Sequence, residues 1–203
     1  MKLDTHVHTS PGSRCSVMSI DQYLKAAAQL ELQTICVTNH GEMSDYDELL
    51  RRAPAGMTVI PGVEISSREG DFIFYSTDLA YLRTLKPAQP LPDRAERPAG
   101  CAVVWVHPFA GSPGGRGMGE GYLAEVAGRV DGIEVYNGNW PDEAASRMAG
   151  KLASAHDLAE LGGSDTHRRK QLFRCWTEVQ AEVGGAADLV RAIRERKTRA
   201  EKV

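Results

Sequence analysis

The sequence predicts an α/β protein in which short strands alternate with helices around a small or distorted barrel of seven strands. Apolar runs of strand length alternate with helical patterns along the chain, which is typical of parallel α/β architectures. No GxGxxG motif follows the first strand, as a doubly wound nucleotide-binding sheet would require. The chain has 203 residues, and we interpret residues 1–203 as one domain with its own core.

Strands are predicted where β-branched and other apolar residues cluster between turn signals. The barrel strands are expected at residues 3–8, 34–38, 58–65, 72–75, 101–106, 132–136 and 161–167, with a late strand at 175–180. Pro61 and Gly62 predict a bulge or bend near the end of the third strand. This order fits a distorted, TIM-like (β/α)7 barrel, in which reactive residues gather at the C-terminal ends of the strands.

Helices are expected between these strands. Ser19 followed by Gln22 is a capping-box pattern, and Ser44 is expected to cap the next helix. The helices are predicted at residues 19–32, 44–52, 122–129, 142–158 and 186–198. Residues 86–100 contain four prolines and are expected to form an exposed connection. Residues 111–121 contain six glycines but lack the Lys-Ser or Lys-Thr of a P-loop, so they predict a flexible loop or lid.

Composition limits the classes of function. Hydrophobic residues make up 42% and charged residues 25% of the chain, as in ordinary globular proteins. The net charge of −3 offers no basic surface for nucleic acid, which leaves open a nuclease that makes only local contacts. The four cysteines form no CxxC pair, and no apolar run has the length of a signal peptide or membrane span. We therefore expect a cytoplasmic protein without disulfides, without a membrane partner and without an obligate protein partner.

Histidines fall at the predicted strand exits. The chain has six histidines, and only His156 lies inside a predicted helix. His6 and His8 are two residues apart, so in an extended strand both imidazoles project from the same face. The others follow the second, fifth and seventh strands: His40, His107 and His167. If the barrel closes, these five side chains surround one mouth.

Carboxylates accompany the histidines. Glu64 ends the third strand, Glu134 lies in the sixth, and Asp165 stands two residues before His167. Imidazole and carboxylate together suit zinc, manganese or iron, and a carboxylate can bridge two ions. Two ions about 3.5–4 Å apart form the arrangement that clamps an in-line displacement at phosphorus.

The ordered set of motifs resembles the PHP (polymerase and histidinol phosphatase) superfamily. The resemblance extends from residue 3 to about residue 167 and rests on His6-Val7-His8, Asn39-His40, Pro61-Gly62-Val63-Glu64, His107-Pro108, Gly132-Ile133-Glu134-Val135-Tyr136-Asn137 and Gly163-Ser164-Asp165-Thr166-His167. It implies a distorted seven-stranded barrel of PHP type, two or three bound divalent metal ions (Zn, Mn or Fe), and hydrolysis of phosphoesters.

The resemblance also implies a ligand set. By position, His6, His8, Glu64 and Asp165 would hold one ion, Glu64 would bridge to a second ion on His107, and His40 and His167 would face a third. Three departures leave the third position open. Asn39 stands where the family often has Asp, and Ser13, Arg14, Cys15 and Ser16 replace an acid or histidine. The third ligand of the second ion lacks an evident counterpart, with Asp71 and Asp78 as the nearby acids. Cys15 either replaces the lost ligand or is an inert loop thiol.

The predicted activity is attack of a metal-activated water on phosphorus. Asp165 is expected to be essential, and His40 or His167, if free of metal, would protonate the leaving oxygen. Arg14 and Arg168 are expected to hold phosphate oxygens. Glu134 is expected to be a metal ligand, an outer contact of a ligand or a substrate contact, and its alternative is a structural carboxylate near a strand end. Asn137 is expected to contact the substrate, and its alternative is a polar turn residue. The partner would be a small phosphorylated substrate or a nucleic-acid end.

Two other classes of function remain open from the sequence. A metal-dependent amidohydrolase also carries HxH on its first strand, but it usually needs a lysine at a middle strand end, which this chain lacks. A non-catalytic metal-binding or partner domain is the other alternative, and the intact first ligand set argues against it.

Overall fold

The computed structural model describes residues 1–110 and 118–203. Its principal sheet contains six strands in the order β2-β3-β4-β5-β6-β7, and a smaller sheet has the order β1-β8-β9. The strands are β1 Lys2–Leu3, β2 Thr34–Val37, β3 Thr58–Ser67, β4 Gly70–Ser76, β5 Cys101–Val106, β6 Gly132–Asn137, β7 Ala159–Gly163, β8 Cys175–Val179 and β9 Thr198–Lys202. The α-helices are α1 Ile20–Gln29, α2 Ser44–Arg52, α3 Leu79–Thr84, α4 Glu120–Arg129, α5 Glu143–His156 and α6 Ala186–Arg194.

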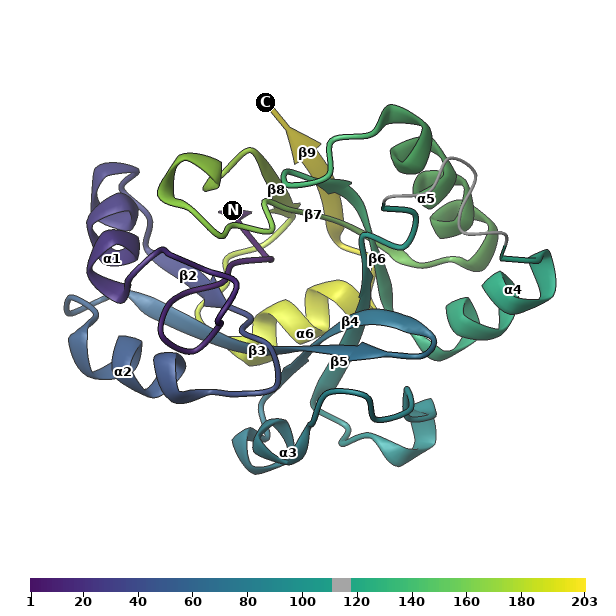
Figure 1. The fold of residues 1–203 in the computed structure, drawn as a ribbon, viewed down its shortest axis with the longest axis horizontal. Helices are drawn as coiled ribbons and strands as arrows, with labels where there is room; N and C mark the ends of the chain where they lie inside the picture. Colours follow the sequence, from purple (N-terminus) through teal and green to yellow (C-terminus); the bar gives the residue numbers. More distant parts are fainter. Residues whose placement is uncertain (111–117) are drawn as a thin grey trace.

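The six-stranded sheet curls into most of a barrel, with α1 and α2 outside one side and α4 and α5 outside the other (Figure 1). Its strands are parallel except for β4, which runs antiparallel to β3 and β5. The prediction of a distorted, TIM-like α/β barrel is therefore confirmed. The antiparallel β4 is the departure from a regular (β/α) repeat, because β3 and β4 form a hairpin without a crossover helix.

Strand β3 changes partner at Pro61 and Gly62. Up to Pro61 it pairs with β2 in parallel, and from Gly62 it pairs with β4 in antiparallel register. A Cβ atom on Gly62 would lie 2.9 Å from Cγ2 of Thr38 and 3.0 Å from Cε1 of Tyr75, so the glycine lets three strands approach. Of the predicted bulge or bend, the register of β3 shows no bulge in the described residues; a register shift is present in β6, between Glu134 and Tyr136.

The segment after β1 closes the barrel between β2 and β7. Val7 forms a parallel bridge with Thr166, and the Thr38 amide donates to the Val7 carbonyl at 2.9 Å. The His8 amide donates to the Thr166 carbonyl at 2.9 Å. The predicted first strand is thus shorter than expected: β1 itself pairs with β8, and residues 4–9 complete the barrel through the Val7–Thr166 bridge and backbone hydrogen bonds.

Strand side chains alternate between two cores, as the two-residue period of a strand requires. Ile73 and Tyr75 face the inside of the barrel, where α6 packs against them, while Phe72 and Phe74 face the outer helices. Figure 1 shows α6 (yellow) within the curl of the sheet. The interior is therefore filled at one end by α6, and polar side chains occupy the other end.

Several element boundaries differ from the predictions. The capping box of Ser19 and Gln22 is present at α1. Ser44 is not a cap: it is the first residue of α2, and Met43 occupies the cap position without a side-chain hydrogen bond. Residues 86–100 form a mostly exposed connection, as predicted, although Leu91 and Arg97 within it are buried.

The remaining differences lie toward the C-terminal half. Strand β9 was not predicted; it pairs with β8 over Thr198–Lys202, and the closing helix that was expected to reach Thr198 ends at Arg194. Most of the predicted glycine-rich lid, residues 111–117, lies outside the described residues. Among the residues that the structure describes, no helix is both long and apolar enough to cross a membrane.

Candidate metal centre

The structure brings the seven predicted ligands together at the C-terminal mouth of the barrel. His6 and His8 come from the closing segment, and Glu64 comes from the part of β3 that faces inward. The others follow β2, β5 and β7, where His40, His107, Asp165 and His167 stand. The potential ligand atoms of His6, His8 and Glu64 lie within 4.8 Å of one another, as do those of His6, His107 and Asp165.

Glu64 is the central side chain of this cluster. Its Oε2 lies 3.0 Å from Nε2 of His8, 3.4 Å from Nε2 of His6 and 3.3 Å from Nδ1 of His40. Its Oε1 lies 3.3 Å from Nε2 of His107. One buried carboxylate therefore contacts four imidazoles from three different strand ends, which is the arrangement a bridging ligand requires.

Asp165 is the second carboxylate that approaches His6 and His8. Its Oδ1 lies 3.4 Å from Nε2 of His8 and 3.6 Å from Nε2 of His6. Asp165 and His107 both have a positive φ, of 48° and 30°. The left-handed region costs a non-glycine residue roughly 1–2 kcal/mol, and such strain concentrates at functional sites. In both residues it follows directly on a strand exit, where the chain turns its side chain into the mouth.

Electrostatics favour a cation in the cluster. Burial opposes ionisation of Glu64, yet the imidazoles of His6, His107 and His8 hold the pKa of its carboxyl well below the usual range. Burial likewise opposes ionisation of Asp165, but His6 and His8 lower its pKa. Conversely, burial disfavours protonation of His6, and the nearby carboxylates still raise its pKa well above the ordinary value. The carboxylates thus draw positive charge, which protons supply here and which a divalent ion would supply with better geometry.

Two outer contacts fix the orientation of the opening histidines. Oε1 of Glu134 lies 3.0 Å from Nδ1 of His6, and Oγ of Ser13 lies 3.2 Å from Nδ1 of His8. A metal takes the unprotonated ring nitrogen, so the opposite N–H needs an acceptor, and these two residues provide it. The donor set therefore fits divalent metal ions. Nε2 of both rings points to the carboxylates, and Nδ1 of each ring forms a hydrogen bond with Glu134 or Ser13. Sequence reasoning had missed the role of Ser13.

Replacing Glu134 with glutamine is expected to weaken metal binding roughly 10–100-fold, because His6 would lose the charged acceptor that fixes its tautomer. Isothermal titration with Zn²⁺ or Mn²⁺ measures this change. The matched control is Glu160→Gln, which alters the neighbouring strand β7 at a position between the inward-facing Ala159 and Leu161. Equal affinities of the Glu134 variant and the wild type would show that Glu134 does not orient His6.

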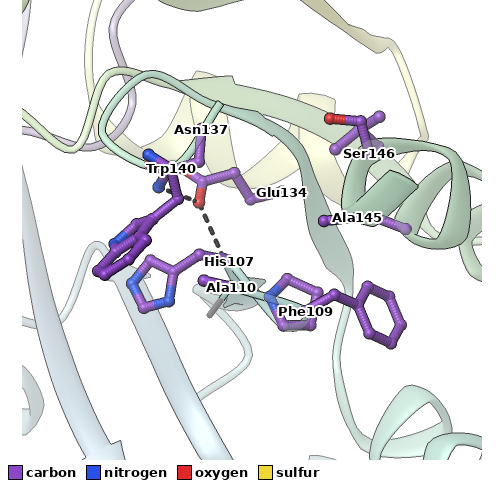
Figure 2. A pocket seen from close by; sticks show the side chains of 11 residues that line it. His107, Phe109, Ala110, Glu134, Asn137, Trp140, Ala145 and Ser146 are labelled. Carbon is purple, nitrogen blue, oxygen red and sulfur yellow. Dashed lines mark hydrogen bonds between the residues drawn. The ribbon is translucent and has the colours of Figure 1, made fainter. Parts of the chain in front are cut away.

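Figure 2 shows how Glu134 and Asn137 are engaged by the protein. Oε2 of Glu134 accepts hydrogen bonds from the His107 amide at 2.9 Å and from Nδ2 of Asn137 at 2.8 Å. Oδ1 of Asn137 accepts from the Asn139 and Trp140 amides. The cavity that they line measures about 20 Å³, which suffices for little more than a water molecule. Their predicted contact with substrate stays a prediction, whereas their contacts with the ligand-bearing loops are present.

Of the two acids considered for the second ion, only Asp71 lies at the mouth. Oδ2 of Asp71 is 3.7 Å from Nδ1 of His107, and Asp71 pairs in register with Val106. Asp78 lies at the opposite end of β4, where it caps α3 by accepting from the Tyr81 amide. Because Nε2 of His107 faces Glu64, Asp71 approaches the far nitrogen of the ring. It is placed to orient His107 rather than to share an ion with Glu64.

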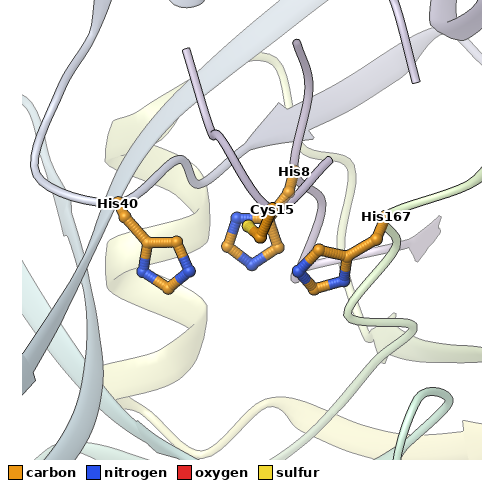
Figure 3. Close-up of side chains that lie close together, drawn as sticks. All are labelled: His8, Cys15, His40 and His167. Atoms are coloured by element: carbon orange, nitrogen blue, oxygen red, sulfur yellow. The ribbon is translucent and has the colours of Figure 1, made fainter. Parts of the chain in front are cut away.

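Cys15 joins a second group of potential ligands. Figure 3 shows Cys15 with His8, His40 and His167, and one potential ligand atom from each lies within 4.8 Å of the others. Burial raises the pKa of the Cys15 thiol, and a hydrogen bond with Ser13 opposes this shift. Burial also lowers the pKa of His40 and of His167, which favours the neutral ring that a metal requires.

The predicted phosphate-binding arginines are exposed. Arg14 adjoins Cys15 and Arg168 adjoins His167, and neither forms an ion pair with another described residue. Their role stays a prediction. Asn39, which replaces a family aspartate, has a structural role: its Oδ1 accepts from the Thr9 amide at 2.8 Å and its Nδ2 donates to Asp45 at 3.1 Å. It ties the loop after His8 to the end of β2.

Comparison with known proteins agrees with the fold. The family model of the PHP domain matches residues 4–99, and the PHP-associated family model matches residues 143–198. A search of curated protein sequences found no significant match.

Three solved structures are similar over nearly the whole chain. PsfC from Pseudomonas syringae PB-5123 is 25% identical with a TM-score of 0.74, over 100% of this chain and 91% of that one. A two-domain protein of Bacteroides vulgatus ATCC 8482, which contains a predicted PHP-like metal-dependent phosphoesterase, is 21% identical with a TM-score of 0.74; the match covers 100% of this chain and 64% of that one. A protein of Bifidobacterium adolescentis ATCC 15703 that has been assigned as a metal-dependent phosphoesterase is 14% identical with a TM-score of 0.65. The match covers 96% of both chains.

The barrel and its cluster of histidines and carboxylates define a metal-dependent hydrolase of the α/β-barrel class. Within that class, the chain belongs to the PHP superfamily, since its two family models cover most of the sequence and the motifs fall at the strand ends.

Proposed function

We propose that the protein is a metal-dependent phosphoesterase that acts on small phosphorylated molecules. The observation that carries this proposal is the position of Glu64, whose two carboxylate oxygens separately face His6, His8 and His40 on one side and His107 on the other. A carboxylate placed between two sets of imidazoles suits two neighbouring ions, and such pairs are used for displacement at phosphorus. The phosphoesterase assignments of two structural relatives point in the same direction.

When bound, divalent ions would supply charge to neutralise a phosphate and a water of lowered pKa. The protein's own residues would then position the reaction. Glu134 and Ser13 hold the rings of His6 and His8, while Asn137 and Asn139 contact Oδ2 of Asp165 at 3.5 and 3.4 Å. Arg14 and Arg168 are proposed to bind phosphate oxygens from either side of the mouth.

A cavity next to the cluster favours a small substrate. It has a volume of about 470 Å³ and is lined by residues 67–71, Met118, Gly119 and Tyr122. Asp71, which approaches His107, forms part of its wall, so the cavity adjoins the proposed reaction centre. This volume is in the range of small-molecule sites, roughly 300–1,000 Å³. Arg68 is exposed there and forms no ion pair with the described residues, so it is available for a second acidic group of the substrate.

A substrate panel tests the proposal. The purified protein would be assayed with Mn²⁺, Zn²⁺ and Fe²⁺ against phosphomonoesters, phosphodiesters, oligonucleotides and an N-acyl amide. We expect metal-dependent hydrolysis of the small phosphoesters. Hydrolysis of the amide alone would favour the amidohydrolase class, and preferential removal of nucleotides would favour a nuclease.

Asp165→Ala is expected to abolish the metal-dependent activity, because the first ion would lose the carboxylate that faces both His6 and His8. The control is Asp157→Ala, which removes an exposed carboxylate beyond the end of α5. The initial rates of hydrolysis by the wild type and the two variants would be measured at saturating metal concentration. Unchanged turnover of the Asp165 variant would rule out the proposed mechanism.

A further inference from the structure

The loop that carries Cys15 is built into the mouth of the barrel. The Val17 amide donates to the His167 carbonyl at 3.0 Å, and Oγ of Ser16 donates to the His8 carbonyl at 2.9 Å. The His40 amide donates to Oγ of Ser13 at 3.2 Å. Hydrogen bonds thus join this loop directly to the residues that bear the imidazoles. The position of Cys15 beside them is a property of the fold rather than of a free loop.

Three members of the group around Cys15 remain available for an ion of their own. Nε2 of His8 lies 3.0 Å from Glu64 and 3.4 Å from Asp165, so it belongs to the carboxylate-centred cluster. His40 faces Glu64 through Nδ1, at 3.3 Å, so Nε2 is the nitrogen that it has left for another ion. Nδ1 of His167 lies 2.8 Å from the Asp165 carbonyl oxygen, to which it can donate, leaving Nε2 for a metal. Cys15, His40 and His167 therefore offer one sulfur and two nitrogen donors, and the rings of His40 and His167 each stack on the ring of His8 with centroids 4.6 Å apart (Figure 3).

Cys15 also differs from the other cysteines of the chain. Cys36, Cys101 and Cys175 are buried, whereas Cys15 is exposed. Zinc sites with one open position commonly combine thiolate and imidazole ligands, and a thiolate is a soft donor that suits zinc, iron or cobalt better than magnesium or manganese.

We propose that Cys15, His40 and His167 form a separate metal position in which the thiolate of Cys15 is a direct ligand. This inference rests on the proposed metal-dependent function, and it adds which ligands hold one of the ions and which kind of ion they prefer. The position selects a thiophilic divalent ion, so the centre holds ions in two kinds of coordination: carboxylate and imidazole around Glu64, and thiolate and imidazole around Cys15.

Alkylation of Cys15 tests the proposal without an activity assay. The metal-free protein would be treated with iodoacetamide, with and without Zn²⁺, and modification would be followed by peptide mass spectrometry. A ligand thiolate is protected in proportion to occupancy, so at a metal concentration 100 times Kd the rate should fall about 100-fold. Mg²⁺ at the same concentration should leave the rate unchanged. The buried Cys36, Cys101 and Cys175 serve as internal references.

His40→Ala separates a built site from capture of zinc by a lone thiol. It removes one of the two imidazoles while leaving Cys15 in place, and protection should then require a much higher Zn²⁺ concentration. Equal protection of the variant and the wild type would overturn the proposed three-residue site.

Cobalt substitution gives a spectroscopic check. The Co²⁺-loaded protein should show a thiolate-to-cobalt charge-transfer band in the near ultraviolet that is lost in Cys15→Ser. Cys15→His should keep the same number of bound ions without the band. The inference would be overturned if the protein binds two ions and hydrolyses phosphoesters but shows neither protection of Cys15 nor the charge-transfer band. That result would leave the proposed function intact. Absence of metal binding and of hydrolysis would overturn both.

Discussion

Replacing Glu64 with glutamine is expected to remove the metal ions from the carboxylate-centred cluster and to abolish hydrolysis. The two oxygens of Glu64 face imidazoles from three strand ends, at 3.0 to 3.4 Å. Glutamine keeps the shape but replaces one charged oxygen by an NH2 group, which cannot bind a cation. Both sets of imidazoles would lose their common ligand. The loss of activity should go well beyond the roughly 10–100-fold typical of changes in outer contacts.

Metal content after dialysis, measured by mass spectrometry, and kcat/KM on a small phosphoester check this expectation. Glu182→Gln is the matched control, because Glu182 is exposed in the connection before α6. The circular dichroism of the two variants should agree, which would separate loss of metal from loss of fold. A Glu64 variant that keeps its full metal content would contradict the bridging role.

Replacing Asp131 with alanine is expected to have the largest effect on stability. Asp131 precedes β6, at the end of the barrel away from the metal centre. Its Oδ2 accepts from the Val103 amide at 2.8 Å and from Nη1 of Arg97 at 3.1 Å, and its Oδ1 accepts from Nη1 of Arg94 at 2.8 Å. The Arg97 and Asp131 side chains are only 2% and 4% exposed. Removing the carboxylate would leave a buried guanidinium unpaired, which typically costs about 3–5 kcal/mol.

Urea denaturation measures the free energy of unfolding of this variant. Glu178→Ala is the control, since Glu178 pairs with the exposed Arg199 and such surface pairs contribute about 0–1 kcal/mol. Below its unfolding transition, the Asp131 variant should bind metal like the wild type. A cost of Asp131→Ala as small as that of Glu178→Ala would show that the buried pair contributes no more than a surface pair.

The sequence was sufficient to predict an α/β barrel and the side chains that meet at its mouth, for one physical reason. Parallel strands place their C-terminal ends at one mouth, so a side chain at a strand exit has a known destination even when its neighbours are unknown. His40, His107 and His167 could be assigned in this way, as could Glu64, and the structure brings all four together.

Other features depend on contacts between segments that are distant in sequence. Strand β4 is antiparallel because β3 and β4 form a hairpin. The residue pattern of a strand does not show whether that strand runs parallel or antiparallel to its neighbours. The outer contacts of Glu134 and Ser13, and the choice of Asp71 over Asp78, needed the register of neighbouring strands. Cys15 could not be assigned from its loop alone, because its neighbours are 25 and 152 residues away in the chain, at His40 and His167.

The bridges that close the barrel have a consequence for synthesis of the chain. His6 and His8 leave the ribosome before the other ligands, but their segment is held by Thr38 on one side and by Thr166 on the other. Domains assemble as their parts emerge, and pairings between distant residues form late. We therefore expect the first ligands to be translated to be among the last to be fixed in place, so that the nascent chain acquires its full complement of metal only after residues 165–167 have emerged.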